Sequence, residues 1–165
     1  MTEITTERLV LKKPGLRDKQ SIVSQIGDWE VVQWLSEVPY PYTEDDADDW
    51  ISTLSRQELT FNIYRSDTLI GGIRLTHDDD GFYELGYWLG RVHWGQGFAT
   101  EACKGLPNYA AEELNIKNVK SSHMTGNDAS ARVLNKLGFR KTGDGEMYCL
   151  SRKATLPCIY LALTN

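Results

Sequence analysis

A glycine loop, Gly95-Gln96-Gly97, constrains the fold of this chain more than any other feature. The spacing of hydrophobic residues is typical of a strand before this loop and of a helix after it. Residues 82–89 before the loop form the last of three strand-like runs, and the residues after it form a helix-like run to about residue 114. At such a junction the first helical N–H groups and the helix dipole favour an anion, and glycines let the backbone approach a phosphate closely. The loop therefore predicts binding of a phosphate-bearing ligand.

The two known phosphate loops with similar glycines do not fit this segment. The same spacing recurs at Gly143-Asp144-Gly145, so the position of the glycines matters more than their number. Residue 100 is Thr, which breaks the dinucleotide-binding pattern Gly-x-Gly-x-x-Gly/Ala, and no Gly-Lys-Ser/Thr of a nucleotide-triphosphate loop follows. The strand before the loop also belongs to an antiparallel meander rather than to a strand–helix–strand unit. A third kind of phosphate loop is indicated.

The remaining chain alternates between strand and helix patterns without a repeat or a linker. A capping box at Thr43 and Asp46 marks one helix start, and Gly27 and Gly138 mark two helix ends. The predicted strands are 4–12, 59–65, 69–76, 82–89, 118–124, 139–151 and 156–163. The predicted helices are 17–26, a short one after Asp28, one from Thr43, 97–114 and 128–137. This order predicts a mixed α+β fold: one domain, 1–165, with a mostly antiparallel sheet of about seven strands and helices on both faces.

Composition excludes several classes of protein. The net charge of -5 argues against nucleic-acid binding, and 41% hydrophobic residues argue against long disorder. Three cysteines without Cys-x-x-Cys spacing predict neither a disulfide framework nor a metal site. The polar N-terminus does not read as a signal peptide, and the apolar runs are too short to span a membrane. We expect a soluble, cytoplasmic protein, monomeric or homodimeric, without metal.

Several motifs along the chain carry a family resemblance. Around the glycine loop stands Phe98-Ala99-Thr100-Glu101-Ala102, and later come Asn127-Asp128-Ala129-Ser130 and Lys136-Leu137-Gly138-Phe139. Earlier motifs are TERLVL at 6–11, PYPYT at 39–43, LIGG at 69–72 and ELGYWL at 84–89. In this order they span nearly the whole chain. The sequence resembles the GNAT superfamily of N-acetyltransferases, and within it the RimJ/RimL-like branch that acetylates protein N-termini.

The resemblance implies a site for acetyl-CoA, used as a co-substrate. The family's sheet splays beside this cofactor, and the pyrophosphate lies on the glycine loop. Val92 occupies the place of that loop's usual Gln or Arg, which leaves the contact to Arg91 and to the backbone. The cofactor-binding residues implied are Trp88, Leu89, Arg91, Trp94, Gly95, Gln96, Gly97, Phe98, Ala99, Thr100, Asn127, Ser130 and Lys136.

Two residues are candidates for the chemistry. Ser130 is implied as the group that protonates the departing thiolate; the alternative is a hydroxyl that only caps a helix. The tyrosine that many relatives use is replaced by Leu134. Glu84, on the strand entering the site, is the candidate base, although alternation allows it to face solvent. Glu101, His93 and His123 are other titratable groups near the site, with His93 expected on the loop surface.

The acceptor is expected to be an amine. An α-amine is about one third neutral near pH 7.5, whereas a lysine amine is only about 0.1% neutral, so a site without an evident strong base favours the α-amine. Trp34, Tyr40 and Tyr42 are the candidate substrate-binding residues, the alternative being core anchors. Two other functions remain open: acetylation of a small amine such as a polyamine, amino acid or antibiotic, and a non-catalytic acyl-CoA sensor.

Overall fold

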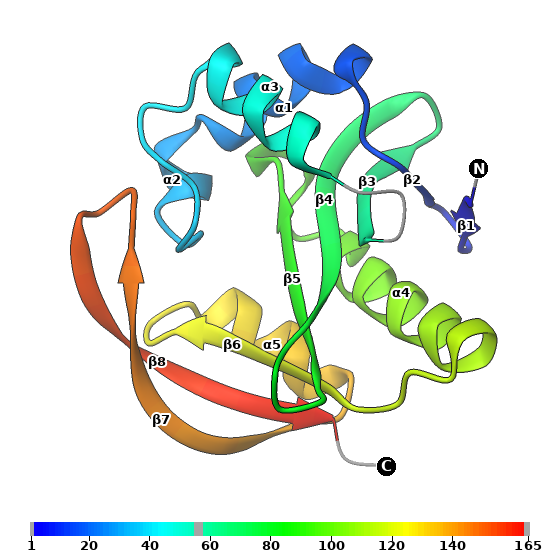
Figure 1. The fold of residues 1–165 in the computed structure, drawn as a ribbon, viewed down its shortest axis with the longest axis vertical. Coiled ribbons are helices and arrows are strands. Elements are labelled where there is room, and N and C mark those ends of the chain that lie inside the picture. Colours follow the sequence, from blue (N-terminus) through cyan, green and yellow to red (C-terminus); the bar gives the residue numbers. More distant parts are fainter. Residues whose placement is uncertain (1, 55–57, 164–165) are drawn as a thin grey trace.

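The computed structural model describes residues 2–54 and 58–163 and places a long twisted sheet at the centre of this part of the chain (Figure 1). The strand order is β1-β2-β3-β4-β5-β6-β8-β7, and every neighbouring pair is antiparallel except β5 and β6. The strands are β1 (Ile4–Thr5), β2 (Val10–Lys12), β3 (Leu59–Arg65), β4 (Thr68–His77), β5 (Tyr83–Leu89), β6 (Val119–Met124), β7 (Phe139–Cys149) and β8 (Ala154–Leu163).

The described sheet has eight strands rather than the predicted seven, because the segment 4–12 is broken in two. The Thr6 amide donates to the Leu9 carbonyl at 2.9 Å, and the Leu9 amide donates to the Thr6 hydroxyl at 3.2 Å. These local bonds close a turn, so β1 folds back on β2 as a short hairpin. The predicted helix 17–26 likewise begins as a single 3₁₀ turn, η1 (Leu16–Asp18), before α1 (Lys19–Ile26).

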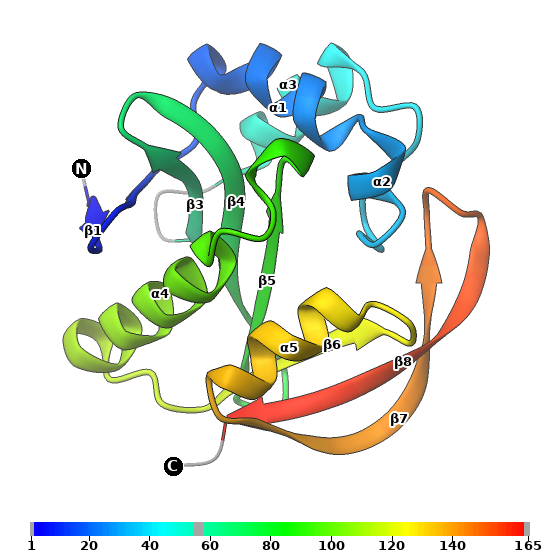
Figure 2. The same cartoon turned by 180° about the vertical axis from the view of Figure 1, so that it is seen from behind.

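Helices cover both faces of the sheet, as predicted. On one side α1 contacts α2 (Trp29–Val32), α3 (Glu44–Thr53) and strand β4, around a cluster that contains Ile22, Ile26 and Leu69. On the other side lie α4 (Phe98–Leu114) and α5 (Asp128–Lys136), in front of the sheet in Figure 2. The buried residues of α4 recur every three or four positions and form one apolar stripe that packs on the sheet: Phe98, Ala102, Cys103, Leu106, Pro107 and Ala110.

The local helix starts follow the sequence signals. The Thr43 hydroxyl accepts from the Asp46 amide at 3.2 Å and the Asp46 carboxylate accepts from the Thr43 amide at 2.8 Å, which confirms the capping box. Asp28 caps α2 by accepting from the Glu30 amide. That helix ends at Val32, so Trp34 lies in the segment after it. None of the described helices is both long and apolar enough to cross a membrane.

Strands β5 and β6 separate after a short parallel pairing, which confirms the predicted splay. Their ladder joins only Tyr83–Leu85 to Val119–Ser121, while β5 continues to Leu89 and β6 to Met124. At the last pair of this ladder, the Ser121 hydroxyl donates a hydrogen bond to the Leu85 carbonyl at 2.8 Å. Figure 1 shows β6 turning away from β5 beyond this point. The separated strand ends leave backbone polar groups available to a ligand.

The long β7–β8 hairpin returns to the helices on the far side of this splay. At its tip the Leu150 amide donates to the Ser36 carbonyl at 2.9 Å, and Arg152 donates to the backbone and side-chain oxygens of Gln33 at 3.0 Å. The Arg152 guanidinium lies 4.8 Å from the centre of the Trp34 ring. The hairpin therefore bridges to the segment after α2 (Figure 1).

Candidate active site

A cavity of about 890 Å³ opens where β5 and β6 separate. Its walls come from the ends of both strands, the N-terminal turns of α4 and α5, and the segment from α1 to α3. A cavity of this volume is in the range that holds a cofactor or a drug-sized ligand. The predicted cofactor and acceptor residues therefore surround one space, with the exceptions given below.

The glycine loop forms one end of this cavity. Gly95 and Gly97 adopt positive φ angles of 74° and 80°, which residues with a Cβ disfavour. Gly97 is also the N-cap of α4. Ala99 and Thr100 line the cavity from the first turn of the helix, whose leading N–H groups have no partner within the helix. The loop and helix start thus have the backbone geometry that an anionic pyrophosphate requires.

The side chains of this loop divide into two groups. Trp94 lines the cavity, and its indole N–H donates to the Leu89 carbonyl at 2.9 Å. Arg91 and Gln96 are exposed and are absent from the described residues that line the cavity. The Phe98 side chain is buried in the core, so the ring lies away from solvent while its backbone remains at the helix start. Backbone groups therefore dominate the inner surface of the loop.

Strand β5 supplies the middle of the wall through Trp88. A Cβ placed on Gly72 of the neighbouring strand would lie 2.5 Å from the indole nitrogen of Trp88, so only a glycine there leaves room for the ring. The Leu89 side chain is buried, and its carbonyl is engaged by Trp94. The two predicted cofactor residues of this strand thus stand at the open edge created by the splay.

Ser130 faces β5 from the first turn of α5, and its hydroxyl lies 2.8 Å from the phenol oxygen of Tyr87. The helix cap is Asn127, whose side-chain oxygen accepts from the Ser130 amide at 3.3 Å. The Ser130 hydroxyl is therefore engaged with Tyr87 and does not act as the cap. Leu134, at the position of the missing tyrosine, is fully buried in the core.

Tyr87 lines the cavity and contacts Ser130, and sequence reasoning did not single it out. Burial raises the pKa of its phenol above the usual range, with a further contribution from the nearby Cys103 thiol, whereas the hydrogen bond to Ser130 lowers it. The phenol therefore stays protonated at neutral pH. When Tyr87 donates to the Ser130 oxygen, the proton of Ser130 is free to point into the cavity. The only sequence signal for this contact was the placement of Tyr87 on the core-facing side of the strand that enters the site.

The titratable groups near the site occupy different positions. Glu84 is exposed and lines the cavity, and His123 lines it from β6 with its Nδ1 nitrogen 3.0 Å from the Met124 carbonyl. The sequence predicts His93 on the loop surface, but in the structure it is half-buried and lines the cavity. Burial, together with the charge of Arg65, lowers the pKa of His93. Glu101 accepts hydrogen bonds from Thr6 and Arg8, so it is not free to serve the acceptor.

The part of the cavity that the segment from α1 to α3 forms is aromatic and contains several acids. Trp34 and Tyr42 line it, but Tyr40 is absent from the described lining residues and instead packs edge-to-face on Trp29 at 4.9 Å. Burial, and then the charge of Asp46, raise the pKa of Tyr42 to about 12. Trp50, which the sequence analysis did not single out, also lines this end. The acidic side chains along the cavity are Glu37, Asp46, Asp49 and Glu84.

Comparison with known proteins places this geometry in a family. The family profile for the acetyltransferase (GNAT) domain matches residues 8–140. The chain belongs to the GNAT family. It is an N-acetyltransferase of mixed α+β fold, and members of this family use acetyl-CoA.

Three similar proteins illustrate the relationship. The chain is 32% identical over 151 residues to an uncharacterized N-acetyltransferase, p20, of Bacillus licheniformis, covering 87% of this chain and 85% of that one. It is 38% identical over 153 residues to YdaF of Bacillus subtilis, provisionally named a ribosomal N-acetyltransferase, covering 87% and 81%. The structure of Mycobacterium smegmatis RimJ in complex with CoA-disulfide superimposes with a TM-score of 0.82 at 19% identity, covering 94% and 81%.

The remaining site residues of this GNAT protein lie on α5 and around it. Lys136 is exposed at the rim and lines the cavity together with Asn127 and Ser130. The described residues hold no cluster of three or more His, Cys, Asp or Glu side chains arranged to bind a metal ion. The cysteines Cys103, Cys149 and Cys158 are buried as free thiols.

Proposed function

We propose that this protein transfers an acetyl group directly from acetyl-CoA to a primary amine, the N-terminal α-amine of a protein or peptide. The observation that carries the proposal is the separation of β5 from β6 beside the N-terminus of α4. It opens one cavity onto the glycine loop, the Tyr87–Ser130 pair and the aromatic end. An anionic cofactor and an amine entering from opposite ends would meet at the strand ends.

In this proposal the cofactor is held mainly by backbone groups. The pyrophosphate lies against the loop from Trp94 to Gly97 and the amides of the first turn of α4, and the pantetheine arm follows Trp88 and Leu89 on β5. Asn127 and Lys136 flank the same path on the α5 side. Because Arg91 and Gln96 face solvent, their side chains reach the cofactor only at its outer edge.

In the proposed chemistry, one side chain gives a proton to the leaving thiolate and another takes a proton from the amine. The neutral amine attacks the thioester carbon, a C–N bond forms, and the C–S bond breaks to release the thiolate. Ser130 donates its hydroxyl proton to the sulfur, and Tyr87, held protonated by burial, stabilises the resulting Ser130 oxygen by donating a hydrogen bond to it. Glu84, exposed at the cavity, accepts the proton that the amine loses, directly or through water. Ser130 then regains a proton from water, and the proton that Glu84 has accepted returns to solvent.

Two considerations favour an α-amine as the acceptor. Its ordinary pKa near 7.7–8.0 leaves a useful neutral fraction at physiological pH, so the exposed Glu84 is a sufficient base, whereas lysine requires a far stronger one. Asp46 and Asp49, which line the cavity beside Trp50, favour a cationic chain end, whereas Glu37 is paired with Arg74. The relationship to YdaF, provisionally named a ribosomal N-acetyltransferase, supports the same class of acceptor.

The test combines binding with turnover. Calorimetry with CoA should give a 1:1 complex, and thiol release from acetyl-CoA should accelerate with peptides that have a free N-terminus. Matched peptides with a blocked N-terminus and one internal lysine, and a set of polyamines, serve as comparison acceptors. Turnover of the blocked peptides or the polyamines in preference to the free N-termini would contradict the proposed acceptor, and absence of CoA binding would contradict the whole proposal.

A further inference from the structure

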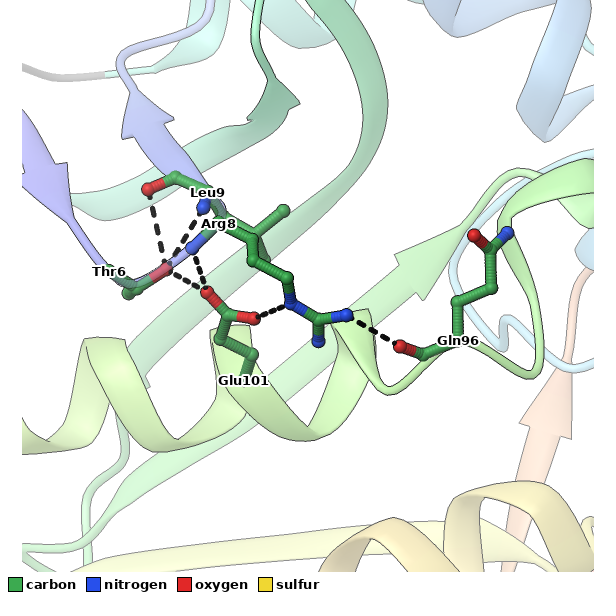
Figure 3. Close-up of polar contacts among 5 residues, drawn as sticks. All are labelled: Thr6, Arg8, Leu9, Gln96 and Glu101. Carbon is green, nitrogen blue, oxygen red and sulfur yellow. Dashed lines mark hydrogen bonds and ion pairs between the residues drawn. The ribbon is translucent and has the colours of Figure 1, made fainter.

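A hydrogen-bonded cluster outside the cavity joins the N-terminal segment to the start of α4 (Figure 3). The Arg8 Nε atom donates to the Glu101 carboxylate at 2.7 Å, and its Nη1 atom donates to the Gln96 carbonyl at 2.9 Å. Glu101 also accepts from the Arg8 amide at 2.7 Å and from the Thr6 hydroxyl at 2.6 Å. One arginine thus contacts both the first turn of α4 and the glycine loop that precedes it.

The bond to Gln96 fixes the direction of one peptide plane. The Gln96 carbonyl and the Gly97 N–H belong to the same peptide group, which is trans, and in a trans peptide the C=O and the N–H point in opposite directions. Because the carbonyl points to Arg8, the Gly97 N–H points away from Arg8. Gly97 has a φ angle of 80° and no Cβ. Without the bond to Arg8, the peptide plane before Gly97 could therefore rotate over a wide range.

The guanidinium group itself is held from several sides. Glu101 anchors Nε, the loop anchors Nη1, and the Phe98 ring lies beneath the guanidinium carbon at 4.6 Å from its centre. The Glu101 carboxylate is largely buried; burial raises its pKa, but the hydrogen bonds from Thr6 and Arg8 outweigh burial and lower it overall. Glu101 therefore remains an anion that cancels the charge of Arg8, so the effect of Arg8 on the loop is one of orientation.

We propose that Arg8 is a positioning residue for the pyrophosphate-binding loop, holding the Gly97 N–H toward the side on which the anion lies. The inference rests on the proposed function, since it assigns a device that prepares this loop for CoA. Arg8 contacts neither the cavity nor the reacting atoms. It acts through the Gln96 carbonyl, and Glu101 and Thr6 act through Arg8.

The test separates the loop from the rest of the site by using two acetyl donors. Arg8→Gln should weaken CoA binding, measured by calorimetry, by about 10- to 100-fold, the effect of losing a charge-assisted hydrogen bond. With S-acetyl-pantetheine, which lacks the pyrophosphate, kcat/KM should stay within about twofold of the wild type. Arg65→Gln is the matched control, because Arg65 also lies over Phe98, at 5.1 Å, but is absent from the described hydrogen bonds to the loop.

Arg8→Lys serves as the conservative variant and as the folding control. A lysine can reach one acceptor but not both, so its CoA affinity should lie between those of wild type and Arg8→Gln. Unchanged CoA affinity in Arg8→Gln would overturn the inference. An equal loss of kcat/KM with acetyl-CoA and with S-acetyl-pantetheine would overturn it as well. If Arg8→Gln does not fold, equal losses with both donors in folded Arg8→Lys would overturn it in the same way. Failure of the wild type to bind CoA would instead overturn the proposed function.

Discussion

The two ends of the cavity are built in different ways. At the glycine loop the surface is backbone, set by positive φ angles at Gly95 and Gly97 and by the splay of β5 from β6. At the opposite end the surface is side chain, with Trp34, Tyr42 and Trp50 among acidic groups. Most substitutions leave backbone groups in place, except at positions such as Gly97 whose φ angle requires glycine, whereas any substitution at an aromatic wall changes the surface directly. In the proposed function, the region that holds the cofactor therefore depends on few side chains, and the region that receives the acceptor depends on many.

This contrast has a direct experimental consequence. A substitution at the loop should change the affinity for CoA and leave the acceptor KM nearly unaltered, and a substitution at the aromatic end should do the reverse. Changes at the Tyr87–Ser130 pair, which lies between the two ends, should change kcat and leave both binding steps intact.

The largest effect is expected at that central pair. Ser130→Ala should lower kcat by about 100- to 1,000-fold, because the thiolate loses its proton donor, and Tyr87→Phe should lower it by about tenfold by releasing the Ser130 hydroxyl. Steady-state kinetics with both substrates measures this. Tyr83→Phe, on the same strand but packed against His77, is the control. Full activity of Ser130→Ala would show that Ser130 is not the acid.

The next effect is expected at the loop. Gly97→Val should weaken CoA binding by roughly 100-fold, since a β-branched residue at a φ of 80° strains the backbone and displaces its amides. Isothermal calorimetry gives the affinity, and a melting curve checks that the variant folds. Gly143→Ala is the control, because a Cβ there meets no atom within 4 Å. Equal CoA affinity in both variants would break the contrast between the two ends.

A smaller effect is expected at the acceptor end. Trp34→Ala removes an aromatic wall and the partner of Arg152, and should raise the acceptor KM about 5- to 10-fold with little change in CoA affinity. Trp29→Ala is the control, since Trp29 packs on Tyr40 and is absent from the described lining of the cavity. A change in CoA affinity of similar size would mean that the two ends are not separate.

The smallest effect concerns stability near the loop. The lowered pKa of Glu101 means that its contribution is complete above the unfolded carboxyl pKa near 4.3 and declines as the pH falls through the folded value. Glu101→Gln should therefore lower the Tm by about 2–4 °C at pH 7 and by less at pH 3.5. Calorimetric scans against Glu113→Gln, an exposed glutamate of the same helix, measure this. A Tm difference that grows on acidification would contradict the assignment.

Sequence reasoning recovered the parts of the molecule that depend on local chemistry. The strand–loop–helix order around Gly95 and Gly97 and the capping box at Thr43 both depend on short stretches of sequence. The splay of the sheet came from the family resemblance, because the few residues of β5 and β6 that pair are not marked by their pattern.

The parts that sequence reasoning missed depend on contacts between distant segments. The hydroxyl of Ser130 meets a tyrosine 43 positions away, and Glu101 meets Thr6 across 95 positions. No periodicity encodes such pairs. For the same reason Tyr40 looked equivalent to Tyr42 in the sequence, yet an aromatic neighbour, Trp29, takes Tyr40 away from the cavity.

The bridge between the β7–β8 hairpin and the segment after α2 has one more consequence. The half of the sheet that contains β6, β8 and β7 is joined to the rest of the molecule at the short β5–β6 ladder. It is joined again at this bridge, where Leu150 and Arg152 contact Ser36 and Gln33 after α2. Hydrogen bonds thus order the chain on both sides of the opening between β5 and β6 when the protein folds, so part of the entropy of ordering it is lost on folding rather than on binding.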